Sequence, residues 1–175
     1  MFHNVFDKII SLDNLFSAWL EFRKGKRHKL DVQSFELNLE DNIFKLHWLL
    51  KTGKYRHGNY VSFCVKDPKP RVIHKAPVVD RVLHHAVFRI LYPIFDGMFI
   101  NDSYSCRIHK GTHKAVKQLG SYIQKVSRNC QQNCFVLKCD IKKFFHSIDH
   151  QILLSLIQKK IDNDKAMGLI QEIVS

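Results

Sequence analysis

The chain has 175 residues, 45% of them hydrophobic and 25% charged, so it is long enough and apolar enough for a globular domain with a core. No apolar run approaches the roughly 18 residues of a membrane-spanning helix, and the N-terminal segment is amphipathic, unlike a signal peptide. The chain has five cysteines, an odd number without a two-residue spacing, which argues against a disulfide framework. We therefore expect a cytoplasmic protein.

The net charge of +12 is concentrated in two segments. Residues 51–81 contain eight Lys or Arg and two acids, and residues 103–139 contain seven Lys or Arg and no acid. The rest of the chain has a net charge of −1. Such local basicity is typical of a surface that contacts phosphate groups. The alternative is that the basic residues only coat two solvated faces.

The apolar periodicity predicts helices and one hairpin in the first half of the chain. A first helix is indicated by apolar residues at helical spacing, namely Val5, Ile9, Leu12, Phe16 and Trp19. A second stripe from Phe35 to Leu50 indicates another helix, with Ser34 as a cap and Gly53 just past its end. Residues 60–66 alternate as a strand, and residues 71–74 can pair back after a turn at 67–70.

The second half predicts further helices and one strand. A third helix is expected from about Val79 to Tyr92, closed or kinked by Pro93. A fourth, from Thr112 to about Ser127, should bury an apolar face and expose its lysines. Residues 135–141 alternate as a strand with Asp140 on the more polar face, and Ser147 or Asp149 can cap the next helix. A last helix begins near Asp164. The expected fold class is α+β, with helices packed on a small antiparallel sheet.

Five sequence blocks together resemble bacterial reverse transcriptases, especially those of diversity-generating retroelements and, more distantly, of group II introns. The blocks are Asp67-Pro-Lys-Pro-Arg-Val-Ile-His74, Val79-Asp-Arg-Val-Leu-His-His-Ala86, Asp102-Ser-Tyr-Ser-Cys-Arg107, Lys110-Gly-Thr-His-Lys-Ala115 and Cys139-Asp-Ile-Lys-Lys-Phe-Phe-His-Ser-Ile-Asp-His150. The resemblance covers roughly residues 20–175 and implies an RNA-directed DNA polymerase. Residues 1–110 would form its helical fingers with a β-hairpin. Residues 111–175 would form a partial palm with the first part of the palm sheet.

The resemblance also implies a role for individual residues. Asp140 would be catalytic and would bind Mg²⁺ with the Ile141 carbonyl, because a hard cation can bridge carboxylate and phosphate oxygens. Phe145 would be the steric gate against a ribose 2′ hydroxyl. The other residues expected to contact the nucleotide are Lys69, Arg71, Lys143 and Phe144, and those expected to contact the template are Arg107, Lys110 and Lys114. The implied partners are an RNA template, a DNA primer and deoxynucleoside triphosphates, with room for an accessory protein and no membrane.

Several of these residues have simpler explanations. Phe144 and Phe145 are typical core aromatics, Asp140 could cap a turn at a strand end, and Asp149 is best explained as a helix cap. Cys130, Cys134 and Cys139 lack the spacing of zinc ligands.

The sequence departs from the family in one respect, because it contains no aromatic-x-Asp-Asp motif to supply further metal-binding carboxylates. We therefore expect a truncated chain that binds nucleic acid weakly and does not polymerise alone. Two other functions stay open. One is a non-catalytic basic RNA-binding module, and the other is a metal-dependent nuclease built on Asp140, for which the sequence offers no cluster of acids.

Overall fold

The computed structural model of the protein describes residues 4–174, which form nine helices and one two-stranded sheet. The elements are α1 (Val5–Ile10), α2 (Leu12–Phe22), α3 (Leu30–Leu37), α4 (Leu39–Lys51), β1 (Val61–Val65), β2 (Arg71–Lys75), α5 (Val78–Asp96), α6 (Thr112–Val126), α7 (Phe144–Ser147), α8 (His150–Gln158) and α9 (Asp164–Val174). The fold is mostly helical, an α+β structure with a minimal sheet. None of the helices within residues 4–174 combines the length and apolar character of a transmembrane span.

The backbone divides into two compact units. The first, which we call the core unit, contains the described residues up to Ile94 and those from Asp149 on. The second, which we call the α6 unit, runs from Phe95 to Ile148.

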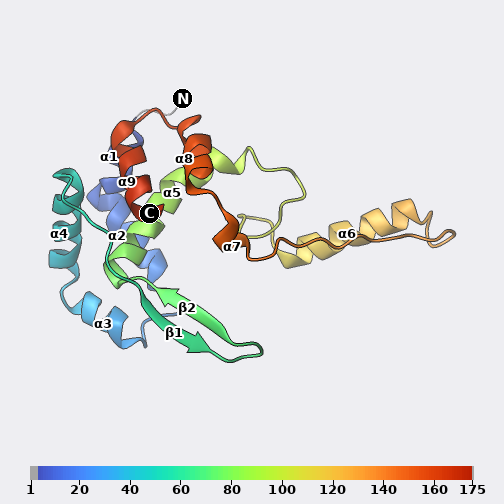
Figure 1. Ribbon diagram of the computed structural model, residues 1–175, viewed down its shortest axis with the longest axis horizontal. Helices are drawn as coiled ribbons and strands as arrows, with labels where there is room; N and C mark the ends of the chain where they lie inside the picture. The colour runs from blue at the N-terminus through green and yellow to red at the C-terminus, as the bar shows by residue number, and fades with distance from the viewer. Residues whose placement is uncertain (1–3, 175) are drawn as a thin grey trace. The chain divides into compact units, whose positions relative to one another are not determined.

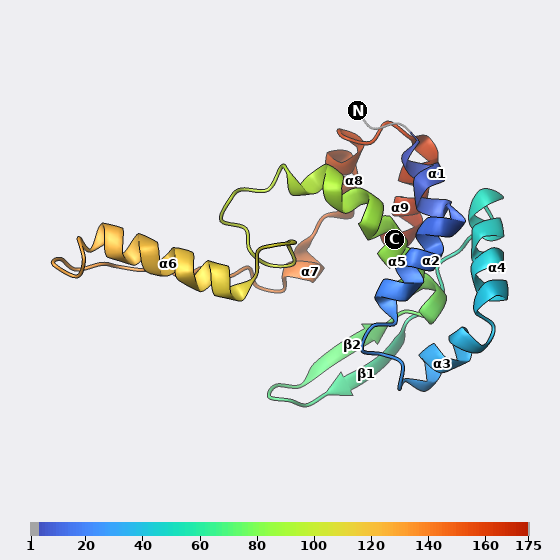
Figure 2. The ribbon, with the colours of Figure 1, turned by 180° about the vertical axis from the view of Figure 1, so that it is seen from behind.

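The core unit contains a helical hydrophobic core. In it α2 packs against α1 and α4, and α9 packs against α1 and α8 (Figures 1 and 2). The largest fully buried apolar side chains are Trp19, Phe22, Ile9, Leu15, Ile43, Leu46, Leu83 and Ile161. The Trp19 ring lies close to two other aromatic rings, with its centroid 5.9 Å from that of Phe22 and 5.1 Å from that of Phe35. Burial of these side chains is the main source of stability in such a unit.

Two of the predicted helices are each interrupted. The expected N-terminal helix is two helices, because Ser11 ends α1 and caps α2, where its Oγ accepts a hydrogen bond from the Asn14 backbone N–H at 3.3 Å. The stripe from Phe35 to Leu50 is likewise divided between α3 and α4, and Ser34 lies inside α3. At Ser11 a short polar side chain competes for backbone hydrogen bonds, so the continuous apolar stripe there does not give a continuous helix. At Asn38, between α3 and α4, the side chain makes no capping hydrogen bond.

The hairpin is confirmed by the structure. β1 and β2 pair antiparallel, from Val61 opposite Lys75 to Val65 opposite Arg71, and the ribbon projects from the helices of the core unit (Figure 1). Gly53 follows α4 in a left-handed conformation with φ 69°, as its place in the sequence predicts. α5 continues through Pro93 to Asp96, one turn further than expected.

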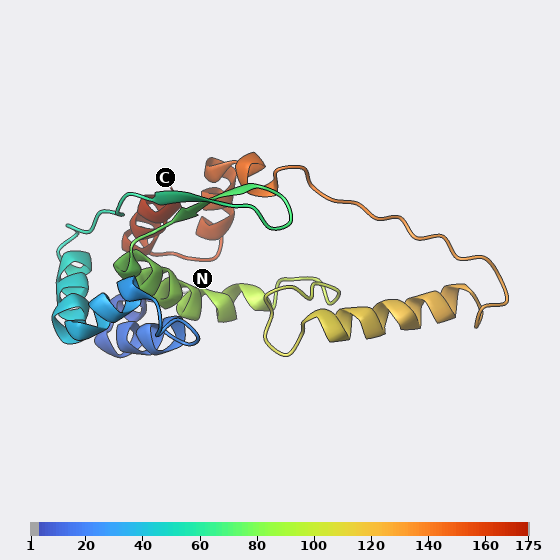
Figure 3. The same ribbon diagram turned by 90° about the horizontal axis from the view of Figure 1, so that it is seen from below.

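The α6 unit differs from the prediction in two ways. α6 forms over the expected range, but none of its residues is buried, because no described element covers its apolar face. Residues 135–141 form an extended segment without strand pairing, since the strands that the structure describes pair only with each other (Figure 3). Phe135 and Leu137 are 92% and 88% exposed. The predicted strand over residues 135–141 is therefore not formed among the described residues, because no neighbouring strand pairs with its backbone.

Candidate nucleic-acid interface

The hairpin presents cations together with apolar side chains. Its register places Phe63, Val65, Arg71 and Ile73 on one face of the ribbon, and all four are exposed. Lys69 lies in the connecting turn and is also exposed. Because a projecting two-stranded ribbon buries neither face, its cations can reach an extended partner without rearrangement of the core. The structure thus brings the two predicted nucleotide contacts, Lys69 and Arg71, onto one ribbon.

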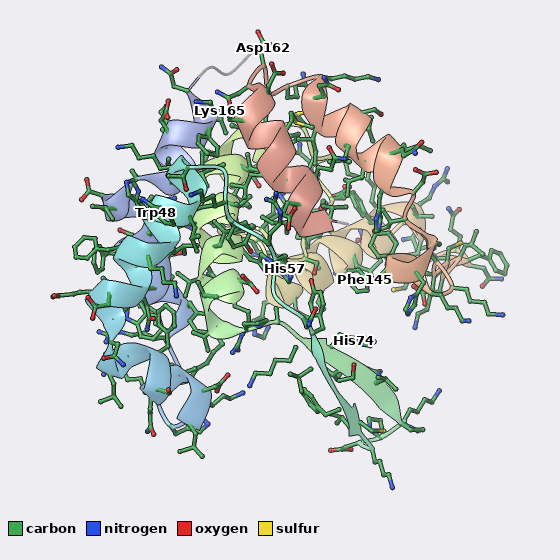
Figure 4. The ribbon with its side chains drawn as sticks, turned by 60° about the vertical axis from the view of Figure 1, so that its left-hand side comes forward. Trp48, His57, His74, Phe145, Asp162 and Lys165 are labelled. Carbon is green, nitrogen blue, oxygen red and sulfur yellow. The ribbon has the colours of Figure 1, made fainter. Side chains whose placement is uncertain are left out.

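The opposite face of the ribbon contains a serine and histidine pair. Ser62 and His74 are directly opposite each other, and Ser62 Oγ lies 2.7 Å from His74 Nδ1. His74 is labelled on the hairpin in Figure 4. No carboxylate among the described residues orients the imidazole, and the pair is exposed. We interpret it as a cross-strand hydrogen bond that supports the register of the hairpin.

An acidic residue joins the base of the hairpin to two helices. Asp31 of α3 accepts from Lys75 Nζ at 2.7 Å and from the Arg81 guanidinium of α5 at 2.5 Å. Burial alone would raise the pKa of Asp31, but its hydrogen bonds and ion pairs with Lys75 and Arg81 outweigh burial and lower the pKa. This three-residue cluster orients β2 relative to α3 and α5.

A buried carboxylate holds the chain that leads into the hairpin. Asp80 is 1% exposed and accepts from the Tyr55 hydroxyl at 2.8 Å and from the Gly58 backbone N–H at 2.9 Å. A Cβ at Gly58 would lie 2.8 Å from Pro77 Cγ and 2.9 Å from Asp80 Oδ2, so only glycine fits there. Burial and the bond to Asp80 raise the pKa of Tyr55, which keeps its hydroxyl a donor. Asp80 belongs to one of the five sequence blocks, but the sequence does not show that it is buried.

A pair of histidines extends this network. His57 Nε2 lies 3.2 Å from His84 Nε2, and His57 Nδ1 donates to the Gly58 carbonyl at 2.8 Å. In the neutral pair, His57 Nε2 therefore accepts a hydrogen bond from His84. Burial and the neighbouring His57 lower the pKa of His84, against the opposite effect of Asp80. The His57 backbone N–H donates to Glu172 of α9 at 2.9 Å, so the network reaches the last helix.

Arg107, a predicted template contact, is bonded within the α6 unit. Its Nε donates to Asp96 Oδ1 at 2.8 Å, and its terminal nitrogens donate to the carbonyls of Asp96 at 2.9 Å and Ile100 at 3.0 Å. The guanidinium also lies 5.5 Å from the centroid of the Phe99 ring. These contacts fold the loop after α5 around Arg107. Its contact with a template strand stays a prediction.

The same loop is joined to α6 by an aspartate and two tyrosines. Asp102 accepts from the Tyr104 hydroxyl at 3.0 Å and from the Tyr122 hydroxyl of α6 at 2.8 Å. Lys110 donates to the Asn101 carbonyl and lies 5.0 Å from the centroid of the Tyr104 ring. Lys110 therefore supports the loop, while its predicted template contact stays a prediction.

α6 is basic on one side and apolar on the other. Lys114, Lys117 and Lys125 fall within one face at 100° per residue, and all three are exposed. The structure describes no acidic partner for any of them. Val116 and Leu119 lie on the opposite face and are also exposed. Lys114 is thus presented to solvent, as a template contact requires.

The segment with the predicted catalytic residues is exposed throughout. Asp140 and Ile141 lie on the unpaired extended segment, and Asp140 makes no hydrogen bond or ion pair with the described residues. No group of three or more potential metal ligands occurs within residues 4–174. The oxygen donors of Asp140 and Ile141 suit Mg²⁺ in kind but supply fewer ligands than the ion requires.

The two phenylalanines after Asp140 form a short helix. Phe144 and Phe145 begin α7, with ring centroids 5.4 Å apart, and Phe145 is 83% exposed. Lys143 precedes them in a left-handed conformation with φ 52°. Within the described residues these aromatics do not belong to a core. Asp149 caps α8 as predicted, by accepting from the N–H groups of Gln151 and Ile152.

The predicted site residues fall in both units. Lys69 and Arg71 belong to the core unit, and the others belong to the α6 unit: Arg107, Lys110, Lys114, Asp140, Ile141, Lys143, Phe144 and Phe145. Each unit thus presents its own exposed basic surface. We call these the hairpin surface (Lys66, Lys69 and Arg71) and the α6 surface (Lys114, Lys117 and Lys125).

The chain is distantly similar to an intron maturase. Nuclear intron maturase 1, mitochondrial, from Arabidopsis thaliana is 22% identical over 137 residues, which cover 68% of this chain and 18% of the relative. Protein YkfC from Escherichia coli (strain K12) is 21% identical over 95 residues, which cover 54% of this chain and 24% of the relative. The chain therefore spans less than a quarter of the length of either relative. No family model matches it.

Proposed function

We propose that this chain is the N-terminal portion of an RNA-directed DNA polymerase, with residues 1–110 as fingers and residues 111–175 as the first part of the palm. The observation that supports nucleic-acid binding is that the hairpin surface and the α6 surface expose cations without acidic partners among the described residues. Unneutralised cations on exposed elements attract phosphate groups and release counterions when they bind. The distant similarity to an intron maturase agrees with RNA as the partner.

The catalytic part of the proposal rests on the segment from Asp140 to Phe145. Asp140 and the Ile141 carbonyl would bind Mg²⁺, which stabilises the attacking hydroxyl and the leaving pyrophosphate in such reactions. The backbone N–H groups of Lys143 and Phe144 would contact the triphosphate, and Phe145 would exclude a ribose 2′ hydroxyl. The partners of the longer enzyme would be an RNA template, a DNA primer and deoxynucleoside triphosphates, in the cytoplasm.

A non-catalytic RNA-binding module is the second candidate. The observation that favours it is that both surfaces expose cations without acidic partners among the described residues, and binding of RNA through them needs no metal site. Both candidates predict binding of RNA through the same two surfaces. They differ in the role of Asp140, which only the polymerase requires.

Nucleic-acid binding is tested by the salt dependence of affinity for a single-stranded RNA. Replacing Lys114, Lys117 and Lys125 with Gln should reduce the slope of log K against log salt by about 2, because each lost phosphate contact removes roughly 0.7. Lys66, Lys69 and Arg71 changed to Gln should give a similar reduction. A matched control changes Lys8, Lys45 and Lys160, which are exposed lysines outside both surfaces. If the control reduces the slope as much, the binding is due to net charge and the two surfaces are not the interface.

A further inference from the structure

A cavity of about 380 Å³ lies in the core unit, between the end of α4 and one face of α9. Its lining residues are Phe6, Leu50, Lys51, Thr52, Gly53, Tyr55, Arg56, Lys165, Gly168, Leu169 and Glu172. The hairpin surface and the α6 surface contribute no residue to this lining. The cavity is therefore separate from the proposed nucleic-acid interface.

The cavity has an apolar wall and a cationic rim. Phe6, Leu50, Tyr55 and Leu169 are all buried, so the wall is part of the hydrophobic core. The rim is formed by three exposed cations, Lys51, Arg56 and Lys165, and the structure describes no acidic partner for any of them. This combination of an apolar wall and cations without described acidic partners favours a ligand with an apolar body and a negative group.

Glu172 is the acid in the lining, and it is already engaged. Its Oε1 accepts from the His57 backbone N–H at 2.9 Å, which holds the carboxylate against the loop before the hairpin. Lys165 lies seven residues before Glu172 on the same face of α9, about 10 Å along the helix axis. Figure 4 shows Lys165 and His57 near opposite ends of α9. A negative ligand group beside Lys165 would thus be separated from the carboxylate of Glu172.

Gly168 gives the cavity its space. It lies on the same face of α9 between Lys165 and Glu172, and a Cβ at this position would meet no heavy atom within 4 Å. A glycine in the middle of a helix is less favourable than an alanine. Because neither close packing nor a positive φ requires glycine here, its effect on the structure is the open volume in front of it.

We propose that this cavity binds a small organic anion, with a flat or branched apolar body against Leu50, Tyr55 and Leu169 and a carboxylate or phosphate beside the rim cations. The volume lies within the usual range for small-molecule sites. The proposal concerns a site of its own and does not depend on polymerase activity or on RNA binding.

Calorimetric titration of the full chain with 1-naphthoate tests the apolar part of the site. The wild type should bind one naphthoate saturably. Gly168→Met, which fills the cavity, should weaken binding by about tenfold or more, since the ring is displaced from its wall. Gly120→Met is the matched control, because Gly120 is also a helical glycine with open space around it and lies in α6. A thermal melt confirms that both variants are folded.

The rim is tested with the same titration. Lys165→Gln should weaken naphthoate binding several-fold, while Lys159→Gln, an exposed lysine after α8, should leave it unchanged. The neutral analogue 1-naphthalenemethanol and inorganic phosphate should each bind at least about tenfold more weakly than 1-naphthoate. Unsaturable binding, or equal affinity in folded Gly168→Met and wild type, would overturn the proposal. Equal affinity for the neutral analogue would overturn the choice of an anion.

Discussion

The core unit and the α6 unit contain similar amphipathic helices but differ in what covers them. In the core unit the apolar faces of α2 and α4 are packed, and Trp19, Ile43 and Leu46 are almost fully buried. In the α6 unit the only buried residue that the structure describes is Ser127. A helical pattern in the sequence therefore predicts a helix in both units, whereas burial depends on whether another element packs against that helix.

The same contrast applies to the polar side chains. Asp80 in the core unit and Asp102 in the α6 unit each accept a hydrogen bond from tyrosine, but Asp80 is buried and Asp102 is exposed. Water can replace a lost partner only at the exposed site. Loss of such an acceptor should thus cost more stability in the core unit than in the α6 unit.

The largest predicted difference between the units is in the free energy of unfolding after loss of a leucine. Leu46→Ala should destabilise the core unit by about 3 kcal/mol, because it leaves a cavity at a site that is 1% exposed. Leu119→Ala in α6, at a site that is 49% exposed, should change stability by less than about 0.5 kcal/mol. Urea unfolding followed by circular dichroism measures both. Equal effects would mean that α6 is covered in solution and would remove the contrast.

Loss of a carboxylate should also lower the free energy of unfolding more in the core unit than in the α6 unit, but by less than the loss of a buried leucine. Asp80→Ala should destabilise the core unit by about 2 to 3 kcal/mol, since it leaves the Tyr55 hydroxyl and the Gly58 N–H without their acceptor. Asp102→Ala should have little effect on stability, although it frees Tyr104 and Tyr122. The same urea experiment applies. A stable Asp80→Ala variant would show that the buried network does not hold the chain before the hairpin.

A smaller effect is expected from acidification. Burial lowers the pKa of both His84 and His85, helped by the neighbouring His57 at His84 and by Lys26 at His85, so the folded core unit binds fewer protons than the unfolded chain. Stability should therefore fall as the pH drops below the ordinary histidine value of about 6.5, until the lowered folded pKa values are passed. The urea midpoint measured from about pH 7 to 5.5 should decrease, and less so in His84→Gln/His85→Gln. A midpoint that rises on acidification would contradict the burial of these rings.

Sequence reasoning predicted the parts of the fold that depend on local signals. The hairpin, the cap at Asp149, the glycine after α4 and the range of α6 follow from turn residues, caps and periodicity. The sequence-based predictions were wrong where strand pairing or burial depends on an element far away in the sequence. Examples are the segment before Asp140, which is unpaired, and the apolar face of α6, which no described element covers. Sequence reasoning also missed the contact of Asp80 with Tyr55, because 25 residues separate them and nothing in the pattern joins them.

The proposed catalytic role of Asp140 is tested most directly by primer extension. The experiment uses a polypeptide in which this chain continues into a segment with the aromatic-x-Asp-Asp motif, supplied with a primed RNA template, Mg²⁺ and deoxynucleoside triphosphates. Asp140→Asn should reduce the extension rate by about a thousandfold or more, because the amide keeps the shape but loses the charge that binds the ions. RNA affinity should be unchanged, and Asp162→Asn, at another exposed aspartate, should extend the primer normally. If Asp140→Asn extends the primer as fast as the parent, Asp140 does not bind the catalytic metal and the polymerase proposal fails.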